Sequence, residues 1–143
     1  MNVATILRQK GRAVTTANPT TTLLEVANKL AVKRIGAIVI VGPKGTVAGI
    51  VSERDIIRSL STQGPECLTR PVSESMTRQV ITCQETDTLD ELMAMMTERR
   101  FRHLPVITDH ALVGIISIGD VVKHHVAEVM MEATAMREYI THS

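Results

Sequence analysis

An internal repeat constrains the fold of this chain more than any other feature of its 143 residues. When the sequence is shifted by 66 positions, residues 14–25 align with residues 80–91, and half of these positions are identical. At an offset of 65, Gly49-Ile-Val-Ser-Glu-Arg-Asp55 aligns with Gly114-Ile-Ile-Ser-Ile-Gly-Asp120. Matches that keep the same order and the same apolar spacing indicate a duplicated unit of about 60 residues.

Each copy predicts the same series of elements: a strand, a helix, two strands joined by a hairpin, and a second helix. Both first helices open with Thr-x-x-Glu, a capping box, and continue with apolar residues at i, i+3, i+4 and i+7. Short polar connections between apolar runs predict the hairpins. The expected elements are extended segments 13–16 and 79–83, helices that follow Thr22 and Thr88, strands 37–41, 47–51, 104–107 and 112–116, and second helices that begin near Ser52 and Ser117.

The central strands predict that the two copies fold together. They are apolar on both faces, so both faces must be covered, and one unit alone is too small to bury much surface. Short helical lead-ins are expected ahead of each copy, at 3–7 and 72–76. Residues 61–71 carry a glycine and two prolines and predict the linker. We expect a first repeat with its lead-in at residues 1–70, a second repeat at 71–126 and a C-terminal helical tail at 127–143.

The last helix is expected to run from Gly119 to about Tyr139, which makes it longer than its counterpart in the first repeat. Because the second repeat offers no further partner for the apolar residues of this extension, they indicate a second subunit, and Met130 and Met131 fit padding of that contact. A homodimer is the expected assembly. The stripe consists of Val122, Val126, Val129, Ala133, Met136 and Ile140.

Composition argues against several classes of protein. The net charge is +1 and aromatic residues make up 1% of the chain, whereas nucleic-acid binders show a basic excess or stacking rings. The sequence has no run of 18 apolar residues that could span a membrane, and residues 1–12 contain no apolar run long enough for a signal peptide. Cys67 and Cys83 have no metal-site spacing, and His124 and His125 fit surface histidines better than a metal pair. We expect a cytoplasmic protein without a metal, a membrane or a nucleic-acid partner.

The repeated Ser-x-x-Asp allows two interpretations. Each copy lies where a strand runs into a helix, and a helix N-terminus attracts phosphate. There a serine hydroxyl can bind the same anion, an aspartate three residues later can accept bonds from ribose hydroxyls, and Gly49 and Gly114 can let a ligand approach the backbone. The same spacing also forms a capping box that needs no ligand. The residues alone favour the cap.

Three motifs resemble those of a tandem pair of CBS (cystathionine-beta-synthase-type) domains, also called a Bateman module. They are the repeated Gly-h-x-Ser-x-x-Asp (h, hydrophobic), the Thr-Leu-x-Glu helix opening and Arg99-Arg-Phe-Arg-His-Leu-Pro-Val106. The resemblance covers about residues 3–125. It implies an α+β fold of two repeats related by pseudo-twofold symmetry, with an extended C-terminal helix and a cleft that binds adenine nucleotides. By resemblance, Asp55 and Asp120 would hold ribose hydroxyls, while Ser52 and Ser117 would face phosphate.

The resemblance also implies that the two sites differ. Arg102 and His103 resemble family positions that reach phosphates, but the first copy has Gly36-Ala37 there, which offer only backbone and an apolar wall for adenine. Arg54 can pair with phosphate in bidentate fashion, whereas Gly119 stands beside Asp120. A solvated turn for the arginines and a core position for His103 stay open as alternatives. The expected nucleotide-binding residues are Thr16, Gly36, Ala37, Gly49, Ser52, Arg54, Asp55, Thr77, Val80, Arg102, His103, Leu104, Pro105, Ser117, Gly119 and Asp120.

The function that the resemblance implies is a non-catalytic regulatory or sensor module. AMP is the leading ligand, with ATP, ADP or NAD(H) as rivals, and no catalytic cofactor is expected. A change in repeat or subunit orientation would carry the signal to an unknown protein effector. The alternatives are a regulatory subunit of an enzyme or transporter that binds no nucleotide of its own, and a nucleotide-processing enzyme. The sequence contains no catalytic triad, phosphate-binding loop or paired-carboxylate motif, which argues against the enzyme.

Overall fold

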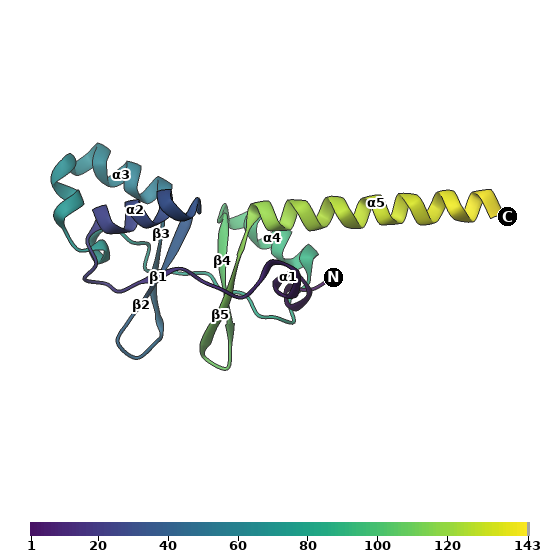
Figure 1. Cartoon of the computed structure of the whole chain (residues 1–143), viewed down its shortest axis with the longest axis horizontal. Helices are drawn as coiled ribbons and strands as arrows, with labels where there is room; N and C mark the ends of the chain where they lie inside the picture. The colour runs from purple at the N-terminus through teal and green to yellow at the C-terminus, as the bar shows by residue number, and fades with distance from the viewer. Residues whose placement is uncertain (143) are drawn as a thin grey trace.

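The computed structural model describes residues 1–142 and places the two repeats side by side (Figure 1). Its α+β architecture is the predicted one. The first repeat consists of β1 (Thr16–Ala17), α2 (Leu23–Lys33), β2 (Ala37–Val41), β3 (Val47–Ser52) and α3 (Glu53–Gln63), preceded by α1 (Val3–Lys10). Two 3-10 helices, η1 (Pro65–Thr69) and η2 (Val72–Glu74), lead to the second repeat. The second repeat consists of α4 (Leu89–Arg99), β4 (His103–Thr108), β5 (Ala111–Ser117) and α5 (Ile118–His142).

The two hairpins are equivalent residue by residue. Ala37 of β2 lies opposite Ser52 of β3, and His103 of β4 lies opposite Ser117 of β5. The register shifts once in each hairpin, after Ile40 and after Val106. The four hairpin strands predicted from the sequence are therefore confirmed, with one or two residues added at the ends of three of them.

The predicted first strand of the second repeat is wrong. β1 pairs in parallel with β2, but within residues 79–83 only Cys83 forms a bridge, to Val106. Cys83 N donates to Pro105 O at 3.0 Å and Ile107 N donates to Cys83 O at 2.9 Å, so the pairing with β4 is confined to this residue. At Thr77 the chain is still bonded to the first repeat, where Ile50 and Thr77 exchange two backbone hydrogen bonds of 3.0 and 2.9 Å.

The segment predicted as the linker, residues 61–71, connects the two repeats and packs on the first of them. Helix α3 continues to Gln63, and Cys67 is 1% exposed within the core of that repeat. Backbone bonds hold the segment there: Leu23 N donates to Arg70 O at 3.0 Å, and Val72 N donates to Thr21 O at 2.7 Å.

Each lead-in completes the core of the other repeat. Ile6 and Leu7 of α1 are fully buried among Leu89, Leu92 and Leu104 of the second repeat. In the same way, the segment around η2 packs into the first repeat, where its buried residues Val72 and Met76 join Leu23, Val26 and Ile38. The exchange ties the two repeats together, because removing either lead-in would open the core of the opposite repeat.

This exchange explains the glycine that opens each repeated motif. A Cβ atom on Gly49 would lie 2.6 Å from the sulfur of Met76 and 2.9 Å from the carbonyl oxygen of Thr77. A Cβ on Gly114 would lie 2.6 Å from a methyl carbon of Leu7. The expectation that these glycines let a ligand approach is therefore corrected: the lead-in segments fill that space.

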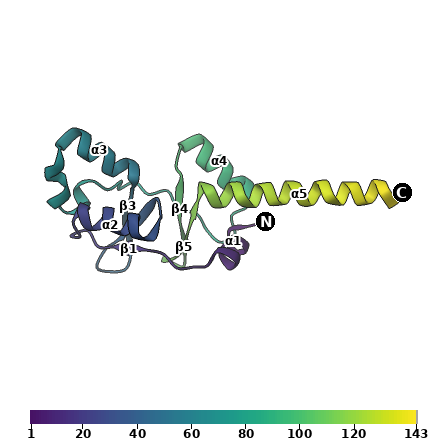
Figure 2. The same cartoon turned by 45° about the horizontal axis from the view of Figure 1, so that its top comes forward.

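Helix α5 is the longest element and extends well beyond the second repeat in both views (Figures 1 and 2). It is a few residues longer than predicted. Val121 and His124 lie one turn apart on the face that enters the second core, and His124 is 5% exposed, so the prediction of a surface position is wrong for this histidine. Within residues 1–142, no helix has the length and apolarity needed to cross a membrane. The same residues contain no group of three potential metal ligands.

Candidate functional site

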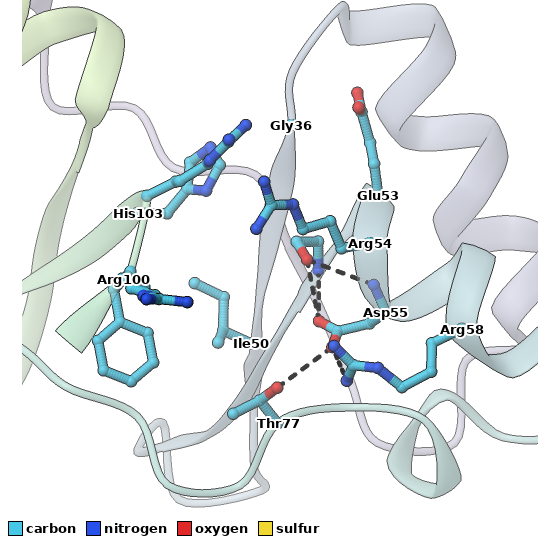
Figure 3. Close-up of a pocket in the computed structure, with 12 residues that line it drawn as sticks. Gly36, Ile50, Glu53, Arg54, Asp55, Arg58, Thr77, Arg100 and His103 are labelled. Atoms are coloured by element: carbon cyan, nitrogen blue, oxygen red, sulfur yellow. Dashed lines mark hydrogen bonds and ion pairs between the residues drawn. The ribbon is translucent and has the colours of Figure 1, made fainter. Parts of the chain in front are cut away.

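A cleft of about 250 Å³ lies between the two repeats (Figure 3). The end of β3 and the first turns of α3 form one wall, and the turn between α4 and β4 forms the other. Residues from both repeats therefore face the same space. The lining residues are Gly36, Ile50, Ser52, Glu53, Arg54, Asp55, Arg58, Thr77, Arg100, Phe101, Arg102 and His103.

A capping box positions the carboxylate of Asp55 at this cleft. The backbone N–H and hydroxyl of Ser52 donate to Oδ2 of Asp55 at 2.9 and 3.1 Å, and Asp55 N donates back to Ser52 Oγ at 3.4 Å. The cap that the sequence allowed is therefore formed. It leaves Asp55 only 6% exposed and fixes its orientation at the start of α3.

The second oxygen of Asp55 has weaker partners. Oδ1 accepts from Arg58 Nη1 and from Thr77 Oγ1, both at 3.3 Å, which is long for a charge-assisted bond (Figure 3). The Arg58 side chain is 70% exposed. Because these partners are distant and one is largely solvated, Oδ1 can accept bonds from other donors that enter the cleft.

The charge of the cleft is positive. Arg54, Arg58, Arg100 and Arg102 line it, against the two carboxylates Glu53 and Asp55. The chain as a whole carries a net charge of only +1, so this excess is local. Such a cluster of guanidinium groups is suited to phosphate or carboxylate groups.

Sequence reasoning predicted seven lining residues and missed five, namely Ile50, Glu53, Arg58, Arg100 and Phe101. Two signals could have found some of them. Arg58 follows Asp55 by three residues on the same helix face, and Arg100-Phe101 belongs to the motif Arg99–Val106. Arg100 adopts a left-handed backbone (φ 57°) that ends α4, as Arg34 (φ 54°) ends α2.

His103 and Gly36 meet across the cleft. A Cβ atom on Gly36 would lie 3.1 Å from Nε2 of His103, so a larger residue would press on the imidazole. Burial lowers the pKa of His103, and the positive charge of Lys10 lowers it further. The repeats are again equivalent here: Glu53 N donates to Gly36 O at 3.1 Å, and Ile118 N donates to Arg102 O at 2.8 Å.

The equivalent residues of the second repeat form a different environment. Ser117 N and Oγ donate to Oδ2 of Asp120 at 2.8 and 2.9 Å, but Lys10 of α1 also donates to this oxygen, at 2.5 Å, and to Ile115 O at 2.7 Å. Burial raises the pKa of Asp120, yet the hydrogen bonds from Lys10 and Ser117 outweigh it, and the net pKa is lowered. Asp120 is thus engaged by a cation of the chain itself.

Nine of the sixteen expected residues do not line the described cleft. Leu104 is fully buried in the core of the second repeat, Ala37 and Pro105 are also buried, and Gly49 packs against Met76. Thr16 belongs to β1. The residues outside the cleft are Thr16, Ala37, Gly49, Val80, Leu104, Pro105, Ser117, Gly119 and Asp120.

Comparison with known proteins identifies the repeated unit. A family model for the CBS domain matches residues 10–62 and 72–127. The mitochondrial CBS domain-containing protein CBSX3 of Arabidopsis thaliana is 34% identical over 123 residues, which cover 83% of this chain and 60% of the plant protein. The chain therefore spans less than two thirds of that relative. The CBS domain-containing protein YhcV of Bacillus subtilis is 32% identical over 107 residues, 75% of each protein.

Solved structures share the fold over most of their length. The CBS-domain containing protein ATU1752 of Agrobacterium tumefaciens matches with a TM-score of 0.85 and 44% identity, covering 87% of this chain and 99% of that one. The CBS domain pair of protein MJ0100, in complex with 5′-methylthioadenosine and S-adenosyl-L-methionine, matches with a TM-score of 0.80 and 26% identity, covering 90% and 98%. The CBS domain protein PAE2072 of Pyrobaculum aerophilum, complexed with AMP, matches with a TM-score of 0.75 and 28% identity, covering 84% and 89%.

Proposed function

This chain belongs to the CBS domain family, and from that premise we propose that it is a non-catalytic regulatory module that binds AMP in the cleft between its repeats. The observation that carries the proposal is the position of Asp55, a nearly buried carboxylate that faces a cluster of arginines. Two solved relatives of similar fold are complexes with adenosine compounds, which supports the same ligand class here.

In the proposed pose, the ribose binds the carboxylate of the cleft and the phosphate binds its arginines. The ribose hydroxyls donate to Oδ1 of Asp55 and replace the long bonds from Arg58 and Thr77. The phosphate is held by Arg54 on the first repeat and Arg102 on the second. Adenine then lies between the repeats, near Ile50.

Size favours a mononucleotide. The cleft measures about 250 Å³, slightly below the usual range of small-molecule sites, which begins at about 300 Å³. We therefore rank AMP ahead of ADP, ATP and NAD(H). In the second repeat, Lys10 donates to the same oxygen of Asp120 that Ser117 caps and already places a cation beside this carboxylate, so we propose that the described cleft fills first.

The signal follows from differential affinity. A nucleotide that contacts both repeats favours the relative orientation in which it is bound more tightly, and an effector protein or a second subunit detects the shift. We propose that the module acts as a homodimer.

Thermal unfolding with a ligand panel tests the nucleotide. AMP at one hundred times its Kd should stabilise the protein by about 2.7 kcal/mol, which raises the Tm on the order of 10 °C. The rise in Tm with ADP, ATP, NAD and NADH ranks these rival ligands. GMP is the control for the base, and inorganic phosphate is the control for a simple anion. If no adenine compound raises the Tm above the phosphate control, the proposed function is wrong.

His103 should make AMP binding depend on pH. In the unfolded chain His103 takes up a proton as the pH falls below about 6.5. In the folded protein its pKa is lowered, so the imidazole stays neutral to a lower pH. The contribution of His103 to stability is therefore complete above pH 6.5 and is lost as the pH falls through its folded pKa. A bound phosphate favours the imidazolium form of His103. As the pH falls and His103 takes up a proton, the AMP affinity of the wild-type protein should therefore rise relative to that of the His103→Gln variant.

Titration of both proteins with AMP from pH 8 to pH 5 measures this effect. The second ionisation of a phosphate ester near pH 6 affects both proteins equally, so the ratio of their Kd values isolates the histidine. A ratio that stays constant over the whole range would show that His103 does not contact the phosphate.

A further inference from the structure

The projecting part of α5 exposes a regular apolar stripe. Val122, Val126 and Val129 are 54%, 50% and 49% exposed, and Met136 is 61% exposed. Beyond Glu128 the helix continues for fourteen described residues, all of them exposed. An isolated helix of that length is marginal in water, because its stability normally comes from packing of an apolar face. A second helix packed on this stripe would supply that missing stabilisation.

The spacing of the stripe is that of a coiled coil. From Val122 the apolar positions recur at alternating intervals of four and three residues, a strict 3.5-residue period. In heptad notation Val122, Val129 and Met136 occupy d, and Val126 and Ala133 occupy a; the sequence continues this spacing to Ile140. A helix that packs on a globular core has a period nearer 3.6, whereas a strict 3.5 period keeps one seam facing a partner helix.

The stripe is also separate from the face that α5 uses within its own chain. Val121 and His124 enter the second core, and Glu128 forms an ion pair with the N-terminal amine at 3.4 Å. These three residues occupy heptad positions c and f. At about 100° per residue they lie about 100–160° around the helix from the nearest a or d position. The intramolecular contacts of α5 therefore leave the seam accessible.

The charges beside the seam complement a second copy of the same helix in parallel orientation. Glu132 occupies g and Arg137 occupies the following e, the two positions that pair between parallel strands. Two parallel copies would therefore form the pair Glu132–Arg137 twice. In the antiparallel arrangement that aligns Val129 of one copy with Ala133 of the other, Glu132 would face Glu132 of the second copy. Lys123 would face Arg137 of the second copy, so both pairs would bring like charges together. Charge therefore favours the parallel arrangement over this antiparallel register.

We propose that α5 forms a parallel two-stranded coiled coil with α5 of a second copy of this chain, through the seam of Val122, Val126, Val129, Ala133 and Met136. This inference rests on the homodimer named in the proposed function but not on nucleotide binding. It places the twofold axis along α5, so that the two CBS pairs lie at the same end of the coil.

Sedimentation velocity of the full chain tests the seam. Wild type should be a dimer at micromolar concentration, and Val129→Glu/Met136→Glu should shift it to monomer, with at least a tenfold weaker dimer Kd. Met131→Glu is the matched control, because Met131 is 71% exposed but lies at position f, away from the seam. A monomeric wild type, or a seam variant that stays dimeric, would overturn the proposal.

An engineered disulfide between the two copies of α5 tests whether the helices are parallel. Ala133→Cys places its thiol at an a position, which meets its own counterpart only in a parallel, in-register pair, so oxidation should yield a covalent dimer. Thr134→Cys, one residue away and off the seam, should not cross-link. The native thiols add little background: Cys67 and Cys83 are 1% and 2% exposed, and burial raises the pKa of Cys83 to about 12. Failure of Ala133→Cys to cross-link would refute the parallel coil.

The outcomes separate this inference from the proposed function. A seam variant that becomes monomeric but keeps the AMP-induced rise in Tm leaves both intact. A wild-type monomer with a normal AMP response overturns the coil and the homodimer but leaves nucleotide binding. A dimer that survives the seam substitutions overturns the coil alone.

Discussion

Replacing Asp55 by alanine should weaken AMP binding about 100-fold. In the proposed pose the carboxylate accepts two ribose hydroxyls, and hydrogen bonds to a charged group contribute about 1.5–3 kcal/mol each. Even the lower value for both bonds sums to about 3 kcal/mol, and each 1.4 kcal/mol is a factor of ten. Isothermal titration of the Asp55→Ala protein with AMP measures the loss directly.

The control must account for the second role of Asp55, which also closes the capping box of α3. Glu91 closes the same type of box in α4 and does not line the cleft. Glu91→Ala should therefore share the stability loss that comes from a disrupted cap, on the order of 1 kcal/mol, and keep wild-type affinity for AMP. Equal AMP affinities for the Asp55 variant and wild type would remove Asp55 from the site.

The sequence predicts what depends on local physics. The run Ala37–Val41 has no polar alternation, so it had to be a strand covered on both faces, and it is. Thr22 and Thr88 supply the cap hydroxyls at the expected helix starts, where each accepts from a backbone N–H at 3.2 Å. Ser52 and Asp55 could be placed together because three residues separate them on one helix.

Contacts between distant segments could not be predicted in the same way. No pattern in the sequence indicates that α1 packs on the second repeat, so the pairing of Lys10 with Asp120, 110 residues away, was not foreseen. The same limitation explains the error at Gly49 and Gly114. A glycine that admits a ligand and a glycine that admits a buried side chain look identical in a sequence, and only the tertiary structure supplies Met76 and Leu7.

The asymmetry of the two repeats follows from these long-range contacts. Both motifs build the same cap, with Asp55 and Asp120 bonded to the preceding serine. What differs is the second partner: a largely exposed arginine at 3.3 Å for Asp55, and a lysine at 2.5 Å for Asp120. A duplicated motif therefore yields one carboxylate whose second oxygen can exchange partners and one already neutralised by the chain. Duplication of a motif does not by itself imply duplication of a binding site.

Leu7→Ala should be among the most destabilising single substitutions in this chain. Leu7 is fully buried and belongs to the core of the second repeat, although its helix precedes the first. Leucine-to-alanine changes at such positions cost about 2–5 kcal/mol, because the cavity that remains collapses only in part. Urea denaturation followed by circular dichroism measures the loss.

Gly114 provides the partner for a double-mutant cycle, because a Cβ there would lie 2.6 Å from Leu7. Gly114→Ala alone should destabilise by about 1–3 kcal/mol through overpacking. Combined with Leu7→Ala, the new methyl enters the space that the leucine vacates, so the double variant should be more stable than the sum of the two losses by at least 1 kcal/mol. Gly49→Ala, in the other core, should add to Leu7→Ala within about 0.5 kcal/mol. Additivity in both cycles would show that α1 does not pack against Gly114, and the exchange of lead-ins between the repeats would be wrong.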